Sequence, residues 1–338
     1  MGEIIRIGLD TSKSVFQVHG VDAAARPVLR KTLRRGEVER FFATLSPTLI
    51  GLEACGASHH WARVLRVLGH EVRLLPPQYV KPYVKRGKND AADAEAICEA
   101  MSRPGMRFVS VRTAENQGEL MLHGARELLI KQRTMLVNAI RGHAAEFGVT
   151  GAKGLCRIEA LIERIALEAG VPALAREIFA SLARQIEAVG EQLAALDTRL
   201  RAWHRADERS LRLATVPGIG VIGATALAMK VPDPGVFRSG RHFAAWIGLT
   251  PKDHSTAGRQ QLGGITRAGD ETVRRLLVSG AMAVIQRAKP GRTSPWLLGL
   301  LARKPRKLVA VALANKTARI AWALMMRGES YRRPAMAG

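Results

Sequence analysis

The sequence predicts a mixed α/β domain at the N-terminus, long helices in the middle and a mainly helical domain at the C-terminus. Over residues 1–100, β-rich segments alternate with helix-like ones, which is typical of an α/β domain. Over residues 174–203, apolar residues recur every three or four positions, as in a coiled coil. The chain then becomes rich in glycine and polar turns. These changes divide it into 1–112, 113–206 and 207–338.

The N-terminal elements follow from local patterns. The expected strands span 4–9, 15–21, 48–52 and 71–75, because these segments are β-rich or alternate at period two. The expected helices span 37–45, 60–68 and 90–101. The first strand ends at Asp10 and a later one ends at Glu53, so both acidic residues follow directly on strands.

Two long helices are expected in the middle region, at 119–147 and 174–203. The apolar positions of the second helix step by four and three residues: Leu174, Ile178, Leu182, Ile186, Val189, Leu193, Leu196, Leu200 and Trp203. Such a seam pairs either with another helix of the same chain or with a second copy of the chain. Periodicity alone does not separate these two interpretations.

The charge balance predicts a polyanionic partner. The 338 residues include 52 Lys and Arg against 29 Asp and Glu, a formal net charge of +23. Phosphate groups would neutralise the resulting self-repulsion. Aromatic residues make up only 5% of the chain, so contacts to the phosphate backbone are expected to outweigh base stacking. The 47% of hydrophobic residues exclude a largely disordered basic protein.

The cellular setting expected from the sequence is a reducing cytoplasm. The three cysteines lie far apart without a Cys-x-x-Cys pair, which excludes a disulfide scaffold and a zinc ribbon. The first residues lack the basic start and apolar stretch of a signal peptide. The most apolar stretch, 308–324, is interrupted by Asn315, Lys316 and Arg319. We therefore expect a soluble, intracellular protein without a membrane partner.

Four acidic residues are candidates for a metal site. Asp10 and Glu53 follow strands, and Asp90 and Asp93 are three residues apart on a helix, so they share one helix face. Carboxylates that converge repel each other unless cations lie between them, and Mg²⁺ is the natural choice for oxygen ligands. Two such ions would suit the cleavage of a phosphodiester. Each residue alone is more commonly a turn, cap or surface residue.

Sugar kinases and related ATPases also begin with a strand that ends in aspartate, so they are an alternative interpretation of Asp10. They need glycine-rich phosphate loops, and the segment after Asp10 contains no glycine. The Walker pattern GxxxxGK[ST] is also absent from the sequence, which argues against a nucleotide-hydrolysing enzyme of that class.

A glycine-rich turn at 216–223 is a candidate for binding nucleic acid. Gly218 and Gly220 belong to a pattern that formally matches GxGxxG, but no βαβ unit surrounds it, so a dinucleotide site is not supported. A tight hairpin between two helices instead presents backbone amides that can hold a phosphate. The alternative is a plain turn between helices.

The polar segment 251–264 contains a candidate nucleophile, Ser255, flanked by cations that include Arg259 and, further on, Arg267. Serine attack on phosphorus would give a covalent ester that conserves the bond energy for rejoining. Ser239 is the competing candidate, and such serines are usually turn or cap residues. A basic run that ends at Lys88 lies just before Asp90. This run would either bind phosphate or form a charged loop exposed to solvent.

Together, these motifs resemble the DEDD-type insertion-sequence transposases (the "IS one-ten" family), now described as bridge-RNA-guided recombinases. The resemblance covers nearly the whole chain. It depends on seven segments: IGLDTSK at 7–13, GLEA at 51–54, KNDAADA at 88–94, VPGIG at 216–220, AAWIGLTP at 244–251, GGITRAGD at 263–270 and ANKTARIAW at 314–322. Each piece is modest alone, and the combination is specific.

The resemblance implies an RNase H-like (RuvC-like) N-terminal domain, a coiled-coil middle and a C-terminal transposase domain with a catalytic serine. The glycine turn at 216–223 adds a helix-hairpin-helix-like element to the expected C-terminal domain. It implies a DEDD tetrad that binds Mg²⁺, formed here by Asp10, Glu53, Asp90 and Asp93. The matching polar loop assigns the serine to Ser255, and Ser239 stays as the alternative.

The implied function is that of a DNA transposase or recombinase that cuts and rejoins strands. Its expected partners are donor and target DNA, a non-coding guide RNA and further copies of the chain. In the implied dimer or tetramer, one subunit supplies the tetrad and another the serine. The expected location is the prokaryotic cytoplasm, at the nucleoid. The alternative is a non-catalytic nucleic-acid-binding protein on the same fold.

Overall fold

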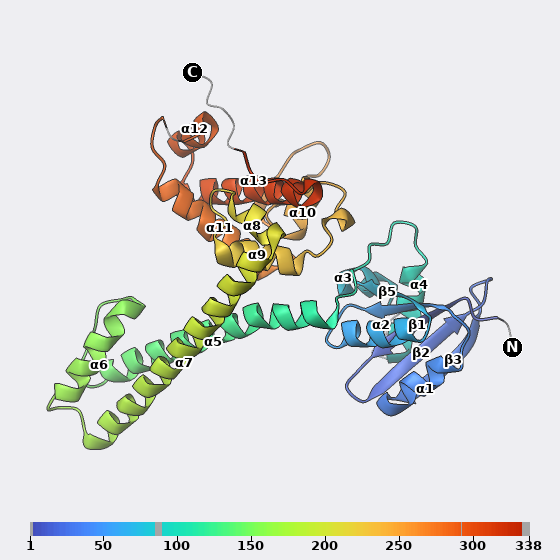
Figure 1. The fold of residues 1–338 in the computed structure, drawn as a ribbon, viewed down its shortest axis with the longest axis horizontal. Helices are drawn as coiled ribbons and strands as arrows, with labels where there is room; N and C mark the ends of the chain where they lie inside the picture. Colours follow the sequence, from blue (N-terminus) through green and yellow to red (C-terminus); the bar gives the residue numbers. More distant parts are fainter. Residues whose placement is uncertain (1–2, 85–89, 292, 333–338) are drawn as a thin grey trace. The chain divides into compact units, whose positions relative to one another are not determined.

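The computed structural model describes residues 3–84, 90–291 and 293–332. The chain forms two compact units, Met1–Gln117 and Gly118–Gly338. A β-sheet dominates the first unit, and the second is mostly helical (Figure 1). This confirms the prediction of a mixed α/β N-terminal part and a mostly helical remainder. The three predicted domain ranges stay predictions.

The described part of the N-terminal unit contains a five-stranded sheet in the order β3-β2-β1-β4-β5. Its strands are β1 (Arg6–Thr11), β2 (Val15–Val21), β3 (Pro27–Arg34), β4 (Leu49–Glu53) and β5 (Glu71–Leu75). Strands β1, β2 and β3 pair in antiparallel fashion, whereas β1, β4 and β5 run parallel. This arrangement is compatible with the nuclease-like domain that the resemblance implies.

Helices cover both faces of this sheet. On one face, Leu9 and Leu52 are fully buried in the same apolar cluster as residues of α1 (Val38–Ala43) and α2 (Ser58–Val67). On the other face, α4 (Asp90–Met101) lies against β1, β2 and β4. The remaining short segments are η1 (Arg35–Glu37), α3 (Pro77–Val80) and η2 (Lys81–Tyr83).

Strand β3 is not among the strands expected from the sequence. Its residues are mostly exposed, and Arg30, Lys31 and Arg34 interrupt any alternation of apolar and polar positions. Pairing with β2, from Val15 opposite Arg34 to Val21 opposite Pro27, holds this edge strand in place. Local hydrophobic periodicity cannot show a pairing of this kind.

Two long helices of the C-terminal unit run antiparallel to each other (Figure 1). These are α5 (Ala114–Ala145) and α7 (Ala173–Ala206). The indole nitrogen of Trp203 donates a hydrogen bond to Glu119 at 2.7 Å, and Arg126 pairs with Asp197 at 2.6 Å. Between them, η3 (Leu155–Arg157) and α6 (Ile158–Leu167) join a small apolar cluster with both long helices.

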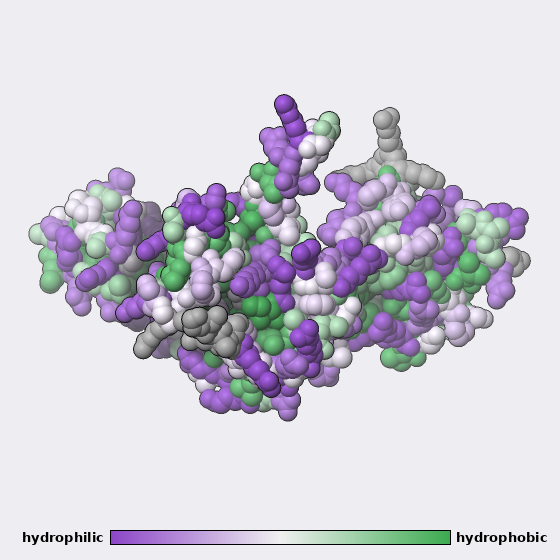
Figure 2. All heavy atoms as spheres, turned by 90° about the horizontal axis from the view of Figure 1, so that it is seen from above, coloured by the Kyte–Doolittle hydropathy of each residue, from purple (hydrophilic) through white to green (hydrophobic). Residues whose placement is uncertain are grey.

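The predicted apolar seam of α7 is only partly buried within the chain. Leu193 and Leu200 are buried, but Leu174 and Ile178 are exposed, and Phe179 is buried in their place. Large apolar side chains also remain exposed along α5. On the face of the molecule shown in Figure 2, hydrophobic patches lie among a hydrophilic majority. Pairing of the two helices within the chain is therefore established, whereas a coiled coil between chains stays a prediction.

The rest of the C-terminal unit packs around one apolar core. Its elements are α8 (Glu208–Ala214), α9 (Val221–Lys230), η4 (Pro234–Val236), α10 (Gly240–Trp246), β6 (Pro251–Asp253), β7 (Leu262–Ile265), α11 (Glu271–Gln286), α12 (Pro295–Arg303) and α13 (Arg306–Arg327). The tightest helix contacts are those of α13 with α11 and α10. A Cβ added at Gly240 would lie 3.2 Å from the backbone of Arg319, so glycine allows α10 to approach α13 closely.

Among the described helices, α13 alone is long and apolar enough by composition to cross a membrane. Its buried residues, which include Ala314, Ala318 and Ala321, belong to the apolar core of the C-terminal unit. The helix therefore contributes one face to that core.

A buried histidine connects α5 to the C-terminal core. His123 is 3% exposed, and its Nε2 lies 3.1 Å from the hydroxyl oxygen of Thr225 in α9. Burial lowers the pKa of His123 to about 4, and the positive charges of Lys230 and Arg126 add to this effect. The imidazole is therefore neutral at physiological pH.

Acidification is expected to destabilise the protein through His123. Its pKa is about 4 when folded and near 6.5 when unfolded, so the unfolded state binds more protons in between, and stability falls as the pH falls from 6.5 towards 4. The loss is about 2 kcal/mol at pH 5 and approaches about 3 kcal/mol below pH 4. Urea unfolding at pH 7 and pH 5 measures it. His123→Gln serves as the control. The pH dependence that remains in this variant comes from other groups, among them His59, whose pKa is also about 4. The same pH dependence in both proteins would contradict the assignment.

Candidate functional site

Two predicted carboxylates lie at the ends of neighbouring strands. Strands β1 and β4 are parallel, and Leu9 pairs with Leu52. Asp10 and Glu53 are the next residues of the two strands, and both are half-buried. Because parallel strands end at the same edge of a sheet, both carboxylates lie at that edge.

Two glycines show which face of the sheet these carboxylates occupy. A Cβ at Gly8 would lie 2.0 Å from the backbone oxygen of Ala94, and a Cβ at Gly51 would lie 3.1 Å from Ile97, so both glycines face α4. Residues two positions apart in a strand share a face. Asp10 and Glu53 follow the glycines by two positions and therefore point to the face that α4 covers.

Helix α4 brings a third carboxylate to this edge. Asp93 is half-buried and directly precedes Ala94, whose carbonyl lies against Gly8. Burial raises the pKa of Glu53, and the negative charge of Asp93 raises it further. Glu53 and Asp93 thus interact electrostatically across the gap between strand and helix.

The rest of the predicted tetrad lies at the edge of what the structure describes. Asp90 is the first residue of α4, one helical turn before Asp93, but its side chain lies outside the described residues, as does Lys88. Among the described side chains, no three His, Cys, Asp or Glu residues lie close enough to hold a metal. The structure therefore brings Glu53 and Asp93 together and places Asp10 at the adjacent strand end.

The chemistry of these donors suits a hard cation. All four predicted side chains offer carboxylate oxygens, the ligands that Mg²⁺ prefers, and none offers the sulfur or imidazole nitrogen favoured by zinc. A divalent cation at this edge would also relieve the repulsion that raises the pKa of Glu53.

The polar loop expected at 251–264 contains a short β-hairpin, and Ser255 lies in its turn. Strands β6 and β7 flank the turn, and Ala257 and Gly258 at its tip have positive φ angles. The Ser255 amide donates a hydrogen bond to Asp253 Oδ1 at 2.9 Å, and its hydroxyl accepts one from the Gln261 amide at 3.0 Å. The Ser255 side chain is exposed to solvent.

Asp253 is a partner of Ser255 that sequence analysis missed. The hydrogen bond from the Ser255 hydroxyl, followed by that from the Ser255 amide, lowers the pKa of Asp253. Asp253 is therefore ionised at neutral pH and accepts hydrogen bonds from Ser255. The available signal was the Asp-x-Ser spacing, which is typical of a turn in which the aspartate binds the backbone two residues on.

The other predicted residues lie elsewhere in the C-terminal unit. Ser239 is the N-cap of α10, and its hydroxyl accepts a hydrogen bond from the His242 amide at 3.2 Å. Arg259 is exposed in the hairpin turn, and Arg267 is exposed in the turn after β7, with a φ of 56°. Both serine hydroxyls therefore accept a backbone amide, Ser239 at the start of a helix and Ser255 within the hairpin turn.

The glycine turn connects α8 to α9, as the sequence predicted. Gly218 has a φ of 91°, and its carbonyl oxygen lies so close to α11 that a Cβ at Gly280 would be 1.7 Å away. Gly220 is the exposed N-cap residue of α9, without a side chain to cap the helix. Packing against α11 is sufficient reason for glycine at 218, and phosphate binding by the turn stays a prediction.

Comparison with known proteins covers both units. A sequence model described as "Transposase IS116/IS110/IS902 family" matches residues 210–295, and a DEDD transposase model described as "Transposase" matches residues 7–148. The "Putative transposase y4pF/y4sB" of Sinorhizobium fredii is 62% identical over 98% of this chain and 86% of its own length. The chain belongs to the IS116/IS110/IS902 transposase family.

More distant transposases of this family also match along the full chain. The "Transposase for insertion sequence element IS1328" of Yersinia enterocolitica is 38% identical over 98% of this chain and 99% of its own. The "Transposase for insertion sequence element IS1111A" of Coxiella burnetii is 36% identical over 98% of this chain and 92% of its own. This transposase therefore binds DNA and cleaves and transfers DNA strands, in a family that commonly uses a divalent metal.

Proposed function

We propose that this transposase is a Mg²⁺-dependent recombinase in which Asp10, Glu53, Asp90 and Asp93 form one metal site in a RuvC-like N-terminal domain. The observation that carries this proposal is the shared position of Asp10 and Glu53 at neighbouring strand ends, on the face where α4 holds Asp93. Bound Mg²⁺ would supply positive charge that stabilises a phosphodiester during cleavage. The four carboxylates hold and orient that charge at the sheet edge.

Ser255 is the proposed nucleophile. Its Oγ forms a bond to phosphorus, the bond from phosphorus to one sugar oxygen breaks, and that sugar leaves as a free hydroxyl. Asp253 supports this role because its carboxylate accepts the hydrogen bond of the attacking hydroxyl. Rejoining reverses the step with the sugar hydroxyl of another strand, so the bond energy is conserved and no nucleotide is consumed.

Nucleic-acid contacts are proposed at Gly218 and Gly220 through backbone amides and at Lys88, Arg259 and Arg267 through their charges. Both arginines are exposed. The net charge of +23 supports binding to donor and target DNA and to a non-coding guide RNA. Such a protein would act in the bacterial cytoplasm, at the nucleoid.

A homo-oligomer, dimer or tetramer, is proposed through the long helices. Met121, Leu128 and Met135 on α5 are 70%, 56% and 70% exposed and are spaced by seven residues. This spacing returns to the same side of a helix after two turns. Leu174 and Ile178 on α7 add exposed apolar surface. Burying these side chains against another copy would form the oligomer. In that oligomer, the tetrad of one subunit and the serine of another would form one active site.

The guide RNA is tested on the protein expressed together with its native flanking DNA and purified through high salt. The RNA that remains bound is extracted and sequenced. We expect a single structured RNA that is encoded beside the gene and is absent when the flanking DNA is omitted. Random host fragments, or no RNA, would contradict guidance by RNA and leave the DNA-cleaving function to be tested separately.

A further inference from the structure

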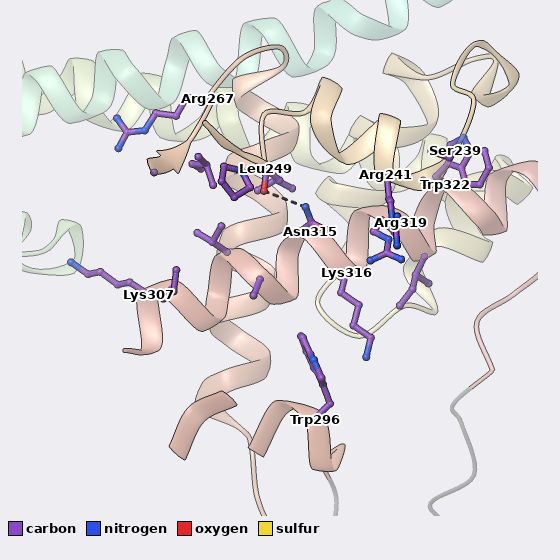
Figure 3. Close-up of a pocket in the computed structure, with 18 of the residues that line it drawn as sticks. Ser239, Arg241, Leu249, Arg267, Trp296, Lys307, Asn315, Lys316, Arg319 and Trp322 are labelled. Carbon is purple, nitrogen blue, oxygen red and sulfur yellow. Dashed lines mark hydrogen bonds between the residues drawn. The ribbon is translucent and has the colours of Figure 1, made fainter. Parts of the chain in front are cut away.

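A large cleft opens in the C-terminal unit, apart from Ser255. Its volume is about 1430 Å³, and its walls come from α10, β7, α12 and α13 (Figure 3). Small-molecule pockets occupy about 300–1,000 Å³, so this cleft has room for more than one nucleotide.

The charge of the cleft has one sign. Five basic side chains line it, and all five are exposed: Arg241, Arg267, Lys307, Lys316 and Arg319. The lining contains no Asp or Glu. Among the described residues, none of the five forms an ion pair with a carboxylate. A cleft lined by one sign of charge concentrates counter-ions of the opposite sign, here phosphate groups.

The same cleft also contains apolar and aromatic surface. Leu249, Val311 and Ile320 contribute aliphatic lining, and Trp296 projects from α12 with 41% of its surface exposed. The Nζ of Lys316 lies 4.2 Å from the centre of the Trp296 ring (Figure 3). Phosphate contacts alone do not need such a surface, but an unpaired base does, because its flat face stacks on aromatic rings.

A base-paired duplex would not use both features. The phosphates of a duplex lie on its outside and its base faces are already stacked, so no base face is free to stack on the indole of Trp296. Grooves that bind single strands combine cations along the backbone with aromatic platforms for the bases. The positive lining also makes an apolar peptide a poor match.

We propose that this cleft binds an unpaired stretch of nucleic acid, with a base stacked on Trp296 and the adjacent phosphates held by Lys316, Arg319 and Arg241. The proposal rests on the proposed function and adds to it a site for strands that are not base-paired. The source of such a strand is either DNA displaced during exchange or an unpaired loop of RNA, and the probes below separate the two.

Binding is measured by fluorescence anisotropy on the full-length protein, stripped of nucleic acid in high salt. The probes are 12-nucleotide single strands of DNA and of RNA and a blunt DNA duplex of the same length. Trp296→Ala is expected to weaken single-strand binding by about 5- to 150-fold, the range measured for stacking on one aromatic residue. Duplex binding should change less than about twofold.

A second variant tests the charges and keeps the Trp296 side chain, although it removes the lysine that lies over the ring. Lys316→Gln with Arg319→Gln should weaken single-strand binding and reduce the slope of log affinity against log salt by about 0.7 for each cation removed. The matched control is Arg184→Gln with Arg201→Gln, which removes two exposed cations of α7 outside the cleft and should leave single-strand affinity nearly unchanged. Thermal unfolding confirms that each variant is folded.

The outcomes separate this proposal from the proposed function. If Trp296→Ala loses affinity only for single-stranded DNA, the cleft binds displaced DNA. If it loses affinity only for single-stranded RNA, the cleft binds the guide RNA. Equal losses for single strands and duplex, or no loss in Trp296→Ala, would overturn the proposal even if the wild-type protein recombines DNA. Selective loss in a wild-type protein that never cleaves DNA would uphold the cleft and contradict the recombinase.

Discussion

Ser255→Ala is expected to abolish the covalent protein–DNA adduct on a cognate substrate. Without the hydroxyl, no atom at this position can form the ester to phosphorus, and Asp253 loses one of its hydrogen-bond donors. Loss of a catalytic nucleophile lowers turnover by several orders of magnitude, so we expect a fall of at least about 10³-fold. Denaturing gels of labelled DNA detect the adduct, and peptide mapping identifies the residue that carries it.

Two other hydroxyls serve as controls for this assignment. Ser239→Ala removes the N-cap of α10, which costs about 1 kcal/mol of stability, but it should leave the adduct intact. Thr256→Ala removes the next hydroxyl of the hairpin and should also retain it. An adduct that persists in Ser255→Ala and disappears in one of these variants would assign the nucleophile to that residue.

Glu53→Gln is expected to eliminate strand cleavage while the protein stays folded. The substitution keeps the shape of the side chain but removes the charge that, in the proposed site, would hold a divalent cation at the sheet edge. A bound metal ion contributes several kcal/mol to phosphodiester cleavage, so the rate should fall by about 10²–10³-fold or more. Cleavage is measured over a Mg²⁺ titration, with thermal unfolding measured alongside.

The matched control for the tetrad is Glu99→Gln. Glu99 lies on α4 but pairs with Arg103 at the surface, away from the sheet edge, so cleavage should be normal. Full activity in Glu53→Gln, or cleavage that continues after chelation of divalent metal, would rule out the metal site. A large drop in melting temperature in Glu53→Gln would indicate a structural role instead.

The two inactive variants also test assembly between subunits. If one subunit supplies the tetrad and another the serine, then mixing Ser255→Ala with Glu53→Gln restores part of the activity. One class of mixed site then contains an intact tetrad beside an intact serine. No recovery on mixing, under conditions where subunits exchange, would place both groups of an active site in one subunit.

Much of the N-terminal site could be predicted because its signals are local. Strand ends that carry Asp10 and Glu53, and a helix that begins near Asp90, appear directly in the order of apolar and acidic residues. The glycines at 8 and 51 show why the sequence could indicate candidate residues but could not predict how they are arranged in space. Only packing shows that both face α4, because a glycine has the same local signature whatever lies against it.

The C-terminal unit was harder to predict because its contacts join distant segments. Ser255 could be named as a candidate from the sequence, but its hairpin could not be predicted. The hairpin depends on pairing between Pro251 and Ile265 across a polar turn that carries no hydrophobic pattern. Edge strand β3 escaped prediction for the same reason. In both cases backbone hydrogen bonds to another strand, and not side-chain periodicity, decide the structure.

The sequence by itself determined the family, the sign of the charge, the acidic strand ends and the long helices, because each depends on residue type and on spacing along the chain. The tertiary structure alone decided which surfaces these residues share. Arg241, Trp296 and Lys316 come from three different helices, and they meet in one cleft only because α10, α12 and α13 pack together. Apolar burial drives that packing, and it brings the cations into one cleft although their charges repel each other.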